Sequence, residues 1–416
     1  MQLIRKYFGN TSDALLFVSL IYVAVVMPFQ KPEVPIWPGV AMMTVAWLFS
    51  GNLKNKIQFF FGNRNAIIFS ALYLFYCFGY FYSSNTNYAQ TDLLLKIPLL
   101  IFPLVITSSS LKDKTDFILK TFLIACFISA VGCIVRAGYM TYTTGENYFY
   151  YYKLSWFFHV GHYAMYLAFA AFTTLYFLFS EKGKTNFFLQ AVYCSAFVFF
   201  TIVIILLSAR AQIIAFGVVI VLGAINYIFK KENRLKGLTI LVSTLIISVA
   251  ALYLVPQTRE RFMTSETEIN SLYTKNNTDN YYTHLRLTIW QTGLEVIKKQ
   301  PFFGAGTGDA KDELIKKAEE KKYDIIVKKN LNYHNQFLQT WAAIGLPGLL
   351  VLLLSIISGT VYAVKQKKFL PLAFFILVVV SFFTESMLER QAGVIFYSFF
   401  SAILIFAHRK ENAEIL

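Results

Sequence analysis

One histidine and two arginines stand where polar segments of the chain meet apolar ones. His334 follows the only long polar segment and opens a long apolar run. Histidine can take a proton from a hydroxyl at physiological pH, although a water-facing interfacial side chain is an equally simple interpretation. Arg210 separates two nearly continuous apolar runs, and Arg286 lies in the polar segment. A membrane-edge arginine indicates function, but contact with lipid phosphate, or simple solvation at Arg286, remains open.

Other polar side chains near the ends of apolar runs are weaker candidates. His162 could line a cavity wall. Lys96 and Arg136 could line an anionic cavity or extend their charges to the membrane surface. Glu385 and Glu389 flank a short loop, where a local ion pair with the neighbouring arginine is the simplest interpretation.

The sequence predicts neither a metal nor a cofactor. The segments expected outside the cytoplasm lack the paired carboxylates that hold Mg²⁺ or Mn²⁺. No serine nucleophile motif is present. The run Gly304–Gly308 superficially resembles a phosphate-binding loop, but no strand precedes it, so a close-packed turn is the better interpretation. The candidate site is therefore cationic and free of metal.

Composition places the chain in a membrane. Of the 416 residues, 56% are hydrophobic and 15% are charged, whereas soluble domains carry about 25% charged residues. The net charge of +15 could suggest nucleic acid, but most basic residues lie in short loops between apolar runs. Orientation in the bilayer explains them better, and no nucleic-acid partner is predicted.

Twelve apolar runs approach the roughly 20 residues that a spanning helix needs. They are 12–29, 34–51, 66–83, 92–109, 116–141, 157–180, 186–207, 210–229, 237–255, 335–364, 369–385 and 391–407. The sequence thus predicts an all-α polytopic membrane protein with about twelve transmembrane helices. A tight turn is expected at Ser208–Arg210, because an arginine in the middle of one long span would be costly.

Along the chain, short loops rich in lysine and arginine alternate with short loops that contain few of them. Basic loops lie on the cytoplasmic side of a membrane, so this alternation predicts that both termini are cytoplasmic. The domains are then helices 1–9 over 1–255, one large periplasmic loop over 256–333, and helices 10–12 over 334–416. The loop is expected to be partly helical. An amphipathic helix is predicted over 284–299, and Asp309 is expected to cap a second helix at about 310–322.

Three motifs together resemble the O-antigen ligase family, which includes O-antigen polymerases and bacterial O-linked oligosaccharyltransferases. His334-Asn335 is followed after nine residues by Gly345 and after two more by Gly348, a spacing typical of the family. Ser208-Ala209-Arg210 resembles its Ser-Arg element with one extra residue between the two. A loop signature of the family is matched by Arg286, Trp290, Pro301, Gly304 and Gly306.

The resemblance implies an enzyme of the bacterial inner membrane whose active site faces the periplasm. Such an enzyme moves a glycan from undecaprenyl diphosphate to a hydroxyl of lipid A-core. Arginine binds phosphate oxygens in a fork, so Arg210 and Arg286 would hold the diphosphate. His334 would act as the general base. Possible further substrate contacts are Trp290, Asn335, His162, Lys96 and Arg136.

Two alternatives remain open at the level of sequence. The first is another activity of the same family, either O-antigen polymerase or protein O-oligosaccharyltransferase, which the motifs do not separate. The second is a transporter of lipid-linked glycans. Transporters tend to show internal repeats and charges near the membrane midplane, whereas here no repeat is found and the candidate site lies at an edge.

Overall fold

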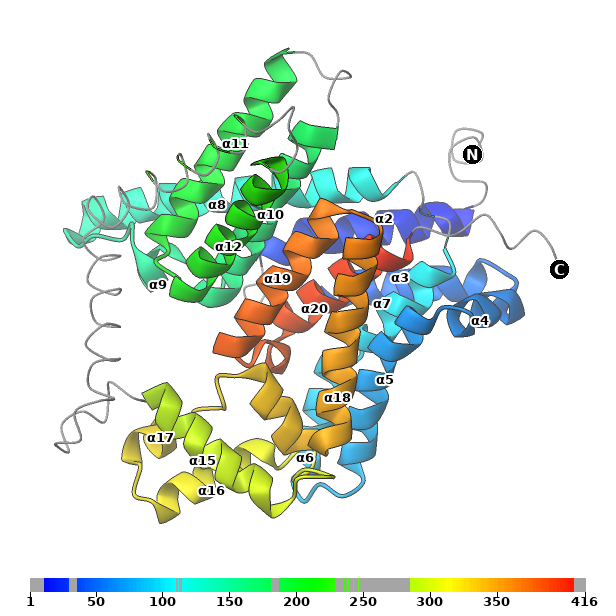
Figure 1. The fold of residues 1–416 in the computed structure, drawn as a ribbon, viewed down its shortest axis with the longest axis vertical. Helices are drawn as coiled ribbons and strands as arrows, with labels where there is room; N and C mark the ends of the chain where they lie inside the picture. The colour runs from blue at the N-terminus through cyan, green and yellow to red at the C-terminus, as the bar shows by residue number, and fades with distance from the viewer. Residues whose placement is uncertain are drawn as a thin grey trace. The chain divides into compact units, whose positions relative to one another are not determined.

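The computed structural model describes residues 11–29, 36–109, 111, 114–180, 187–228 and 285–407, with the single positions 235, 238, 242 and 246. Every regular element in these residues is helical, which confirms the all-α class for the described part of the chain (Figure 1). Within this described part of the chain, six helices are long and apolar enough to cross a membrane, and four shorter ones are also apolar.

The chain forms two compact units, and the first comprises residues 1–125, 289–372 and 385–416. Its described helices are α2 (Thr11–Val26), η1 (Met27–Phe29), α3 (Trp37–Phe49), α4 (Leu53–Phe61), α5 (Arg64–Tyr80), α6 (Thr86–Lys96), α7 (Pro98–Thr107), the start of α8 (Thr115–Thr144), α15 (Leu285–Lys299), α16 (Ala310–Glu320), α17 (Asp324–Lys328), α18 (Gln336–Lys365), η4 (Met387–Glu389), α20 (Gln391–Ser401) and η5 (Ala402–Phe406). Only the residues of α15 from Ile289 onward belong to it.

The second unit comprises residues 126–288 and 373–384. It contains the remainder of α8, with α9 (Tyr151–Leu154), α10 (Val160–Ser180), α11 (Phe187–Leu206), α12 (Arg210–Ile228) and most of α19 (Phe369–Thr384). Helix α10 is largely buried and packs against both α11 and α12. Phe172 of α10 stacks on Phe216 of α12, with ring centroids 5.2 Å apart.

The described helices follow the predicted runs, but several segments differ from them. The ninth run, 237–255, lies outside the described residues apart from three isolated positions. The amphipathic helix α4 occupies a basic segment that was expected to be a loop. The fourth run is two consecutive helices, α6 and α7, separated at Ile97 just before Pro98. The expected turn is present, since α11 ends at Leu206 and α12 begins at Arg210.

Asparagine begins three of the helices that build the first unit. The side-chain oxygens of Asn63, Asn85 and Asn335 accept the backbone N–H of Ala66, Tyr88 and Leu338 at 3.2, 3.1 and 3.1 Å. Each bond satisfies one of the N–H groups that a helix start leaves unpaired. These caps fix where α5, α6 and α18 begin, and the candidate site lies at the start of α18.

Helix α18 is broken, whereas the sequence predicted one continuous span. At Ile344 and Gly345 the backbone leaves the helical region, and Pro347 follows. The break exposes carbonyls that the turn at 301–306 satisfies. The N–H groups of Ala305 and Gly306 donate to the carbonyls of Ala342 and Ala343 at 2.7 and 3.0 Å. A break in a membrane helix is tolerated where other parts of the protein satisfy the freed backbone groups.

The expected close-packed turn is therefore the partner of the break in α18. The N–H of Leu346 donates to the Pro301 carbonyl at 2.9 Å, which closes the junction from the other side. Gly345 has φ 70° and ψ −173°, a conformation accessible almost only to glycine. A Cβ on Gly345 would lie 2.0 Å from the Phe302 carbonyl oxygen. Gly345 thus permits both the break and the close approach of the turn.

We expect Gly345→Ala to lower the free energy of unfolding by more than about 2 kcal/mol, through both backbone strain and the clash with Phe302. The measurement is thermal unfolding of the detergent-purified protein, followed by circular dichroism. Gly132→Ala in α8 is the matched control, because a Cβ there meets nothing within 4 Å. Equal unfolding midpoints for the two variants would contradict this account of the break.

Candidate functional site

His334 lies in the link between α17 and α18, and its chain neighbours are held firmly. The side chain of Tyr333 is fully buried, and its hydroxyl donates to the Ala310 carbonyl at 3.0 Å. Gly293 makes room for this ring, since a Cβ there would lie 2.6 Å from it. Burial raises the pKa of the Tyr333 phenol well above its ordinary value, so the hydroxyl stays a neutral donor.

The backbone of His334 is strained, with a positive φ of 45°. Left-handed conformations are uncommon for residues other than glycine, although asparagine, aspartate and histidine adopt them more often than other side chains, and strained conformations cluster at functional sites. The His334 N–H donates to Oδ1 of Asn332 at 3.1 Å. Asn335 follows as the N-cap of α18. These contacts hold a conformation that turns the histidine out of the helix that it precedes.

The imidazole of His334 contacts a carboxylate. Its Nδ1 lies 2.8 Å from Oε2 of Glu385, and the two side chains are 27% and 18% exposed. The pair is thus shielded on the carboxylate side but remains accessible. Sequence reasoning had assigned Glu385 to a local ion pair with a neighbouring arginine, and the structure gives it a partner 51 residues away.

The segment that carries Glu385 is tied to the start of α18. The N–H of Asn335 donates to Oγ of Ser386 at 3.3 Å. The N–H of Leu388, in η4, donates to Oε1 of the fully buried Gln336 at 2.7 Å. The first residues of α18 and the turn at η4 therefore form one hydrogen-bonded junction, with the His334–Glu385 pair at its edge.

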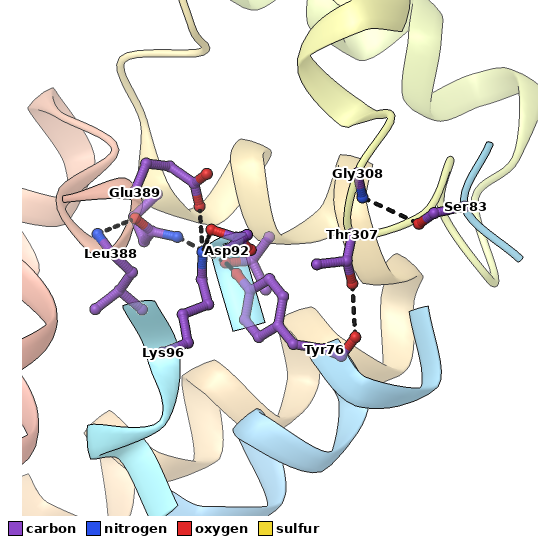
Figure 2. A network of polar contacts seen from close by, with 10 residues as sticks. Tyr76, Ser83, Asp92, Lys96, Thr307, Gly308, Leu388 and Glu389 are labelled. Atoms are coloured by element: carbon purple, nitrogen blue, oxygen red, sulfur yellow. Dashed lines mark hydrogen bonds and ion pairs between the residues drawn. The ribbon is translucent and has the colours of Figure 1, made fainter. Parts of the chain in front are cut away.

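A buried ion cluster of Asp92, Lys96 and Glu389 holds η4 of this junction against α6. Lys96 has no exposed surface, and its ammonium pairs with Asp92 on the same helix and with Glu389 of η4, the latter at 3.0 Å (Figure 2). The ammonium also lies 4.5 Å from the centroid of the Tyr76 ring. Because it is fully buried, Lys96 does not extend to the membrane surface. Its role as a substrate ligand stays a prediction, while its contacts indicate a structural role.

A chain of buried hydroxyl and amide groups links the cluster to α18. Nε2 of Gln336 donates to Oγ1 of Thr340 at 3.0 Å, and Thr340 lies 3.3 Å from the Tyr76 hydroxyl. The carbonyl of Tyr76 accepts a hydrogen bond from the Thr307 hydroxyl at 2.7 Å (Figure 2). The glycine turn, α5, α6, α18 and η4 thus share one polar network that supports His334.

Asp309 has a role that the sequence did not predict. It stands at the N-cap of α16 but makes no side-chain capping bond there. Its carboxylate accepts the N–H groups of Ser84 and Asn85 at 2.6 and 2.7 Å. Asp309 therefore fixes the start of α6 rather than that of its own helix. Among the described residues, no group of three histidine, cysteine or acidic side chains could hold a metal ion.

The second unit contains Arg210, Arg136 and His162. Arg210 is the first residue of α12, directly after the turn at Ser208, which has φ 48°. The guanidinium of Arg136 lies 5.5 Å from the Trp156 ring centroid and donates to the Lys153 carbonyl at 3.2 Å. His162 is 3% exposed on α10.

Arg286 and Trp290 lie one helical turn apart on α15, so they share one face of that helix. Arg286 is exposed and Trp290 is partly buried. The helix begins at Leu285 and ends at Lys299, close to the predicted bounds. Of the predicted site residues, the structure links three. Asn335 contacts Ser386, next to the His334 partner Glu385, and Lys96 pairs with Glu389 of η4.

Sequence reasoning missed the residues that support His334. The spacing of Asp92 and Lys96, four residues apart on one helix, was a readable signal for an ion pair. The partnerships of His334 with Glu385 and of Lys96 with Glu389 join distant segments, and one sequence carries no signal for them. Tyr76 and Gln336 read as ordinary members of apolar helices.

Comparison with known proteins supports the motif analysis. Residues 195–353 match the family described as O-Antigen ligase. The chain is also 27% identical over 418 residues to an uncharacterized protein of Haemophilus influenzae (strain ATCC 51907 / DSM 11121 / KW20 / Rd), covering 94% of this chain and 96% of that protein. The family match includes Arg210, Arg286, Trp290, His334 and Asn335. It excludes Lys96, Arg136 and His162, which lie before it.

We expect Lys96→Met to lower the free energy of unfolding by about 3–5 kcal/mol, because two buried carboxylates lose their counter-charge. Thermal unfolding in detergent measures the loss. Lys317→Met is the control, since Lys317 pairs with Glu320 on the exposed face of α16 and its removal should leave the midpoint near that of the parent. The neutral triple variant Asp92→Asn, Lys96→Met, Glu389→Gln should lose less than Lys96→Met alone. A greater loss in the triple variant would refute the charge argument.

Proposed function

We propose that this chain, which belongs to the O-antigen ligase family through residues 195–353, transfers a glycan from undecaprenyl diphosphate to a hydroxyl of lipid A-core. Its apolar helices and its family make it a multi-pass protein of the bacterial inner membrane. The observation that carries the proposal is His334, a partly exposed histidine with strained backbone that lies within the matched segment and is paired with a carboxylate.

The proposed reaction is a direct displacement at the anomeric carbon. The acceptor hydroxyl attacks this carbon and gives its proton to the imidazole of His334. A bond forms between the acceptor oxygen and the anomeric carbon as the bond from that carbon to the diphosphate oxygen breaks. The electron pair of the broken bond leaves with undecaprenyl diphosphate, and the imidazolium later releases its proton to water. One displacement inverts the anomeric configuration and leaves no covalent intermediate on the protein.

Arg210 and Arg286 hold the diphosphate in this proposal. A diphosphate leaving group gains negative charge as the bond breaks, and arginine stays protonated and binds phosphate oxygens in a fork. The position of Arg210 at the first turn of α12 supports the role, because unpaired N–H groups at a helix start also attract anions. Since diphosphate already leaves easily, neither a metal nor a strong general acid is required.

The structure supports the remaining predicted substrate contacts to different degrees. Trp290 shares a helix face with Arg286, so it is a candidate for contact with the donor sugar. Asn335 is placed beside His334, but its side-chain oxygen is used in capping α18. Arg136 and His162 stay proposals. The ion pairs of Lys96 leave it least suited to bind a phosphate.

The membrane orientation is part of the proposal. We place both termini in the cytoplasm, with twelve spans in all and the segment 256–333 on the periplasmic face. Support comes from the alternation of basic and charge-poor loops in the sequence. In this orientation His334 faces the compartment in which a lipid-linked glycan meets its acceptor.

We expect His334→Asn to abolish long surface glycan when it replaces the wild-type gene in a deletion strain. Asparagine tolerates a left-handed backbone better than alanine does, so the fold should persist while the base is lost. In a purified transfer assay with EDTA present, the rate should fall about 10²–10⁴-fold. His159→Asn, at an exposed histidine, is the control. Undiminished transfer by His334→Asn, or strict dependence on a metal, would refute the mechanism.

The banding of lipopolysaccharide in the deletion strain separates the related activities. Bare core with accumulated lipid-linked polymer supports the ligase. Core capped by a single repeat unit indicates a polymerase, and unchanged lipopolysaccharide with unglycosylated protein indicates a protein oligosaccharyltransferase. No glycan transfer by the purified protein, together with blocked movement of lipid-linked glycan across the membrane in the deletion strain, would favour a transporter instead.

Arg210→Lys and Arg286→Lys should each reduce transfer about 10–100-fold, because lysine keeps the charge but loses the paired hydrogen bonds to phosphate. The steady-state rate against donor concentration measures this effect. Arg64→Lys, at the exposed start of α5, provides the control and should leave transfer unchanged. Full activity in both arginine variants would remove the arginines from the proposed site.

A further inference from the structure

We infer that Glu385 is the positioning residue of His334, which fixes the tautomer of the imidazole and stabilises the charge that it gains. The inference rests on the proposed function, in which His334 is the base. No motif of the sequence singles out Glu385 for this role. The contact of 2.8 Å between Oε2 of Glu385 and Nδ1 of His334 points to it.

The hydrogen-bonding capacity of the two groups decides the tautomer. An ionised carboxylate can only accept hydrogen bonds, so the Nδ1 atom must carry the hydrogen and donate it to Oε2. A neutral imidazole carries one such hydrogen, so its Nε2 atom presents a lone pair. Nε2 is therefore the atom that receives the proton of the acceptor hydroxyl.

The carboxylate also stabilises the charge of the intermediate state. When Nε2 takes the proton from the acceptor hydroxyl, the ring becomes a cation that still donates its Nδ1 hydrogen to Glu385. A hydrogen bond between two charged groups is shorter and stronger than a neutral one. The proton stays on the imidazole until it passes to water, and Glu385 is not itself protonated. In other catalytic histidine–carboxylate pairs, the carboxylate likewise orients the imidazole and stabilises its cation without taking the proton.

Both partners are held in place by contacts that do not involve each other. Glu385 directly precedes Ser386 and η4, which are tied to Asn335, Gln336 and Lys96. His334 directly follows the buried Tyr333, which is anchored on Ala310. An exposed ion pair between free side chains would contribute little. Here the surrounding structure already fixes both backbones, so forming the contact costs less conformational entropy than it would between two mobile segments.

The test compares Glu385→Gln in two backgrounds. Glutamine keeps the size of the side chain but has no charge, and its amide can donate to Nδ1 and so select the wrong tautomer. In the wild-type background we expect kcat to fall at least about 10²-fold while KM for the lipid-linked donor stays within about threefold. In the His334→Asn background the same substitution should have almost no further effect, because Glu385 acts only through the imidazole.

The controls separate this inference from the proposed function. Glu385→Asp retains a carboxylate and should keep more activity than Glu385→Gln, whereas Glu320→Gln on the exposed face of α16 should change nothing. If His334→Asn itself leaves transfer intact, the proposed function fails. If His334→Asn is inactive while Glu385→Gln is fully active, only the positioning role fails. Equal fold losses from Glu385→Gln in both backgrounds would show a general structural effect and overturn the inference.

Discussion

The first unit depends on the neutralisation of one buried charge. Lys96 has no exposed surface in a unit built from apolar helices, and an isolated ammonium there would be prohibitively costly. Asp92 lies on the same helix as Lys96, so the pair alone would fix only α6. The bond to Glu389 makes the requirement a tertiary one, because η4 must sit against α6 for Lys96 to be satisfied. A buried ion pair adds little net stability, but this one requires η4 and α6 to lie together.

That arrangement explains how distant motifs come to act as one element. The turn at 301–306 and the break in α18 satisfy each other through backbone hydrogen bonds, so the glycine signature and the His-Asn…Gly signature describe two halves of one junction. Gly304 and Gly345 are needed on opposite sides of that junction. A Cβ on Gly304 would collide with the backbone of Ala343 and Gly345, and a Cβ on Gly345 would collide with the backbone of Phe302 and Phe303. The rigid part of the site is therefore specified by backbone requirements, and the chemistry is left to the side chains of His334 and its partner.

The sequence was sufficient for whatever depends on composition and local spacing. Apolar runs predicted the helices, the Ser208–Arg210 turn followed from the cost of a buried arginine, and α15 was placed almost to the residue. The sequence did not predict the partner of a charged side chain where several partners were available. Asp309 was expected to cap α16 and instead binds the start of α6. Glu385 and Glu389 were expected to contact a neighbouring arginine, and they contact His334 and Lys96. Such choices depend on tertiary proximity, which a single sequence does not encode visibly.

The placement of His334 outside its helix has a chemical reason. As a helical residue of α18, the side chain would follow the helix surface and point toward the helix start. The left-handed backbone at 334 releases it from that direction, at a cost of order 1–3 kcal/mol. Asn332, Tyr333 and Asn335 supply bonds that offset this cost without using the imidazole. The ring is then free to be oriented by one carboxylate and to keep its other nitrogen open. A base that must meet a large, lipid-bound acceptor needs an accessible nitrogen more than it needs burial, and the exposure of His334 meets that need.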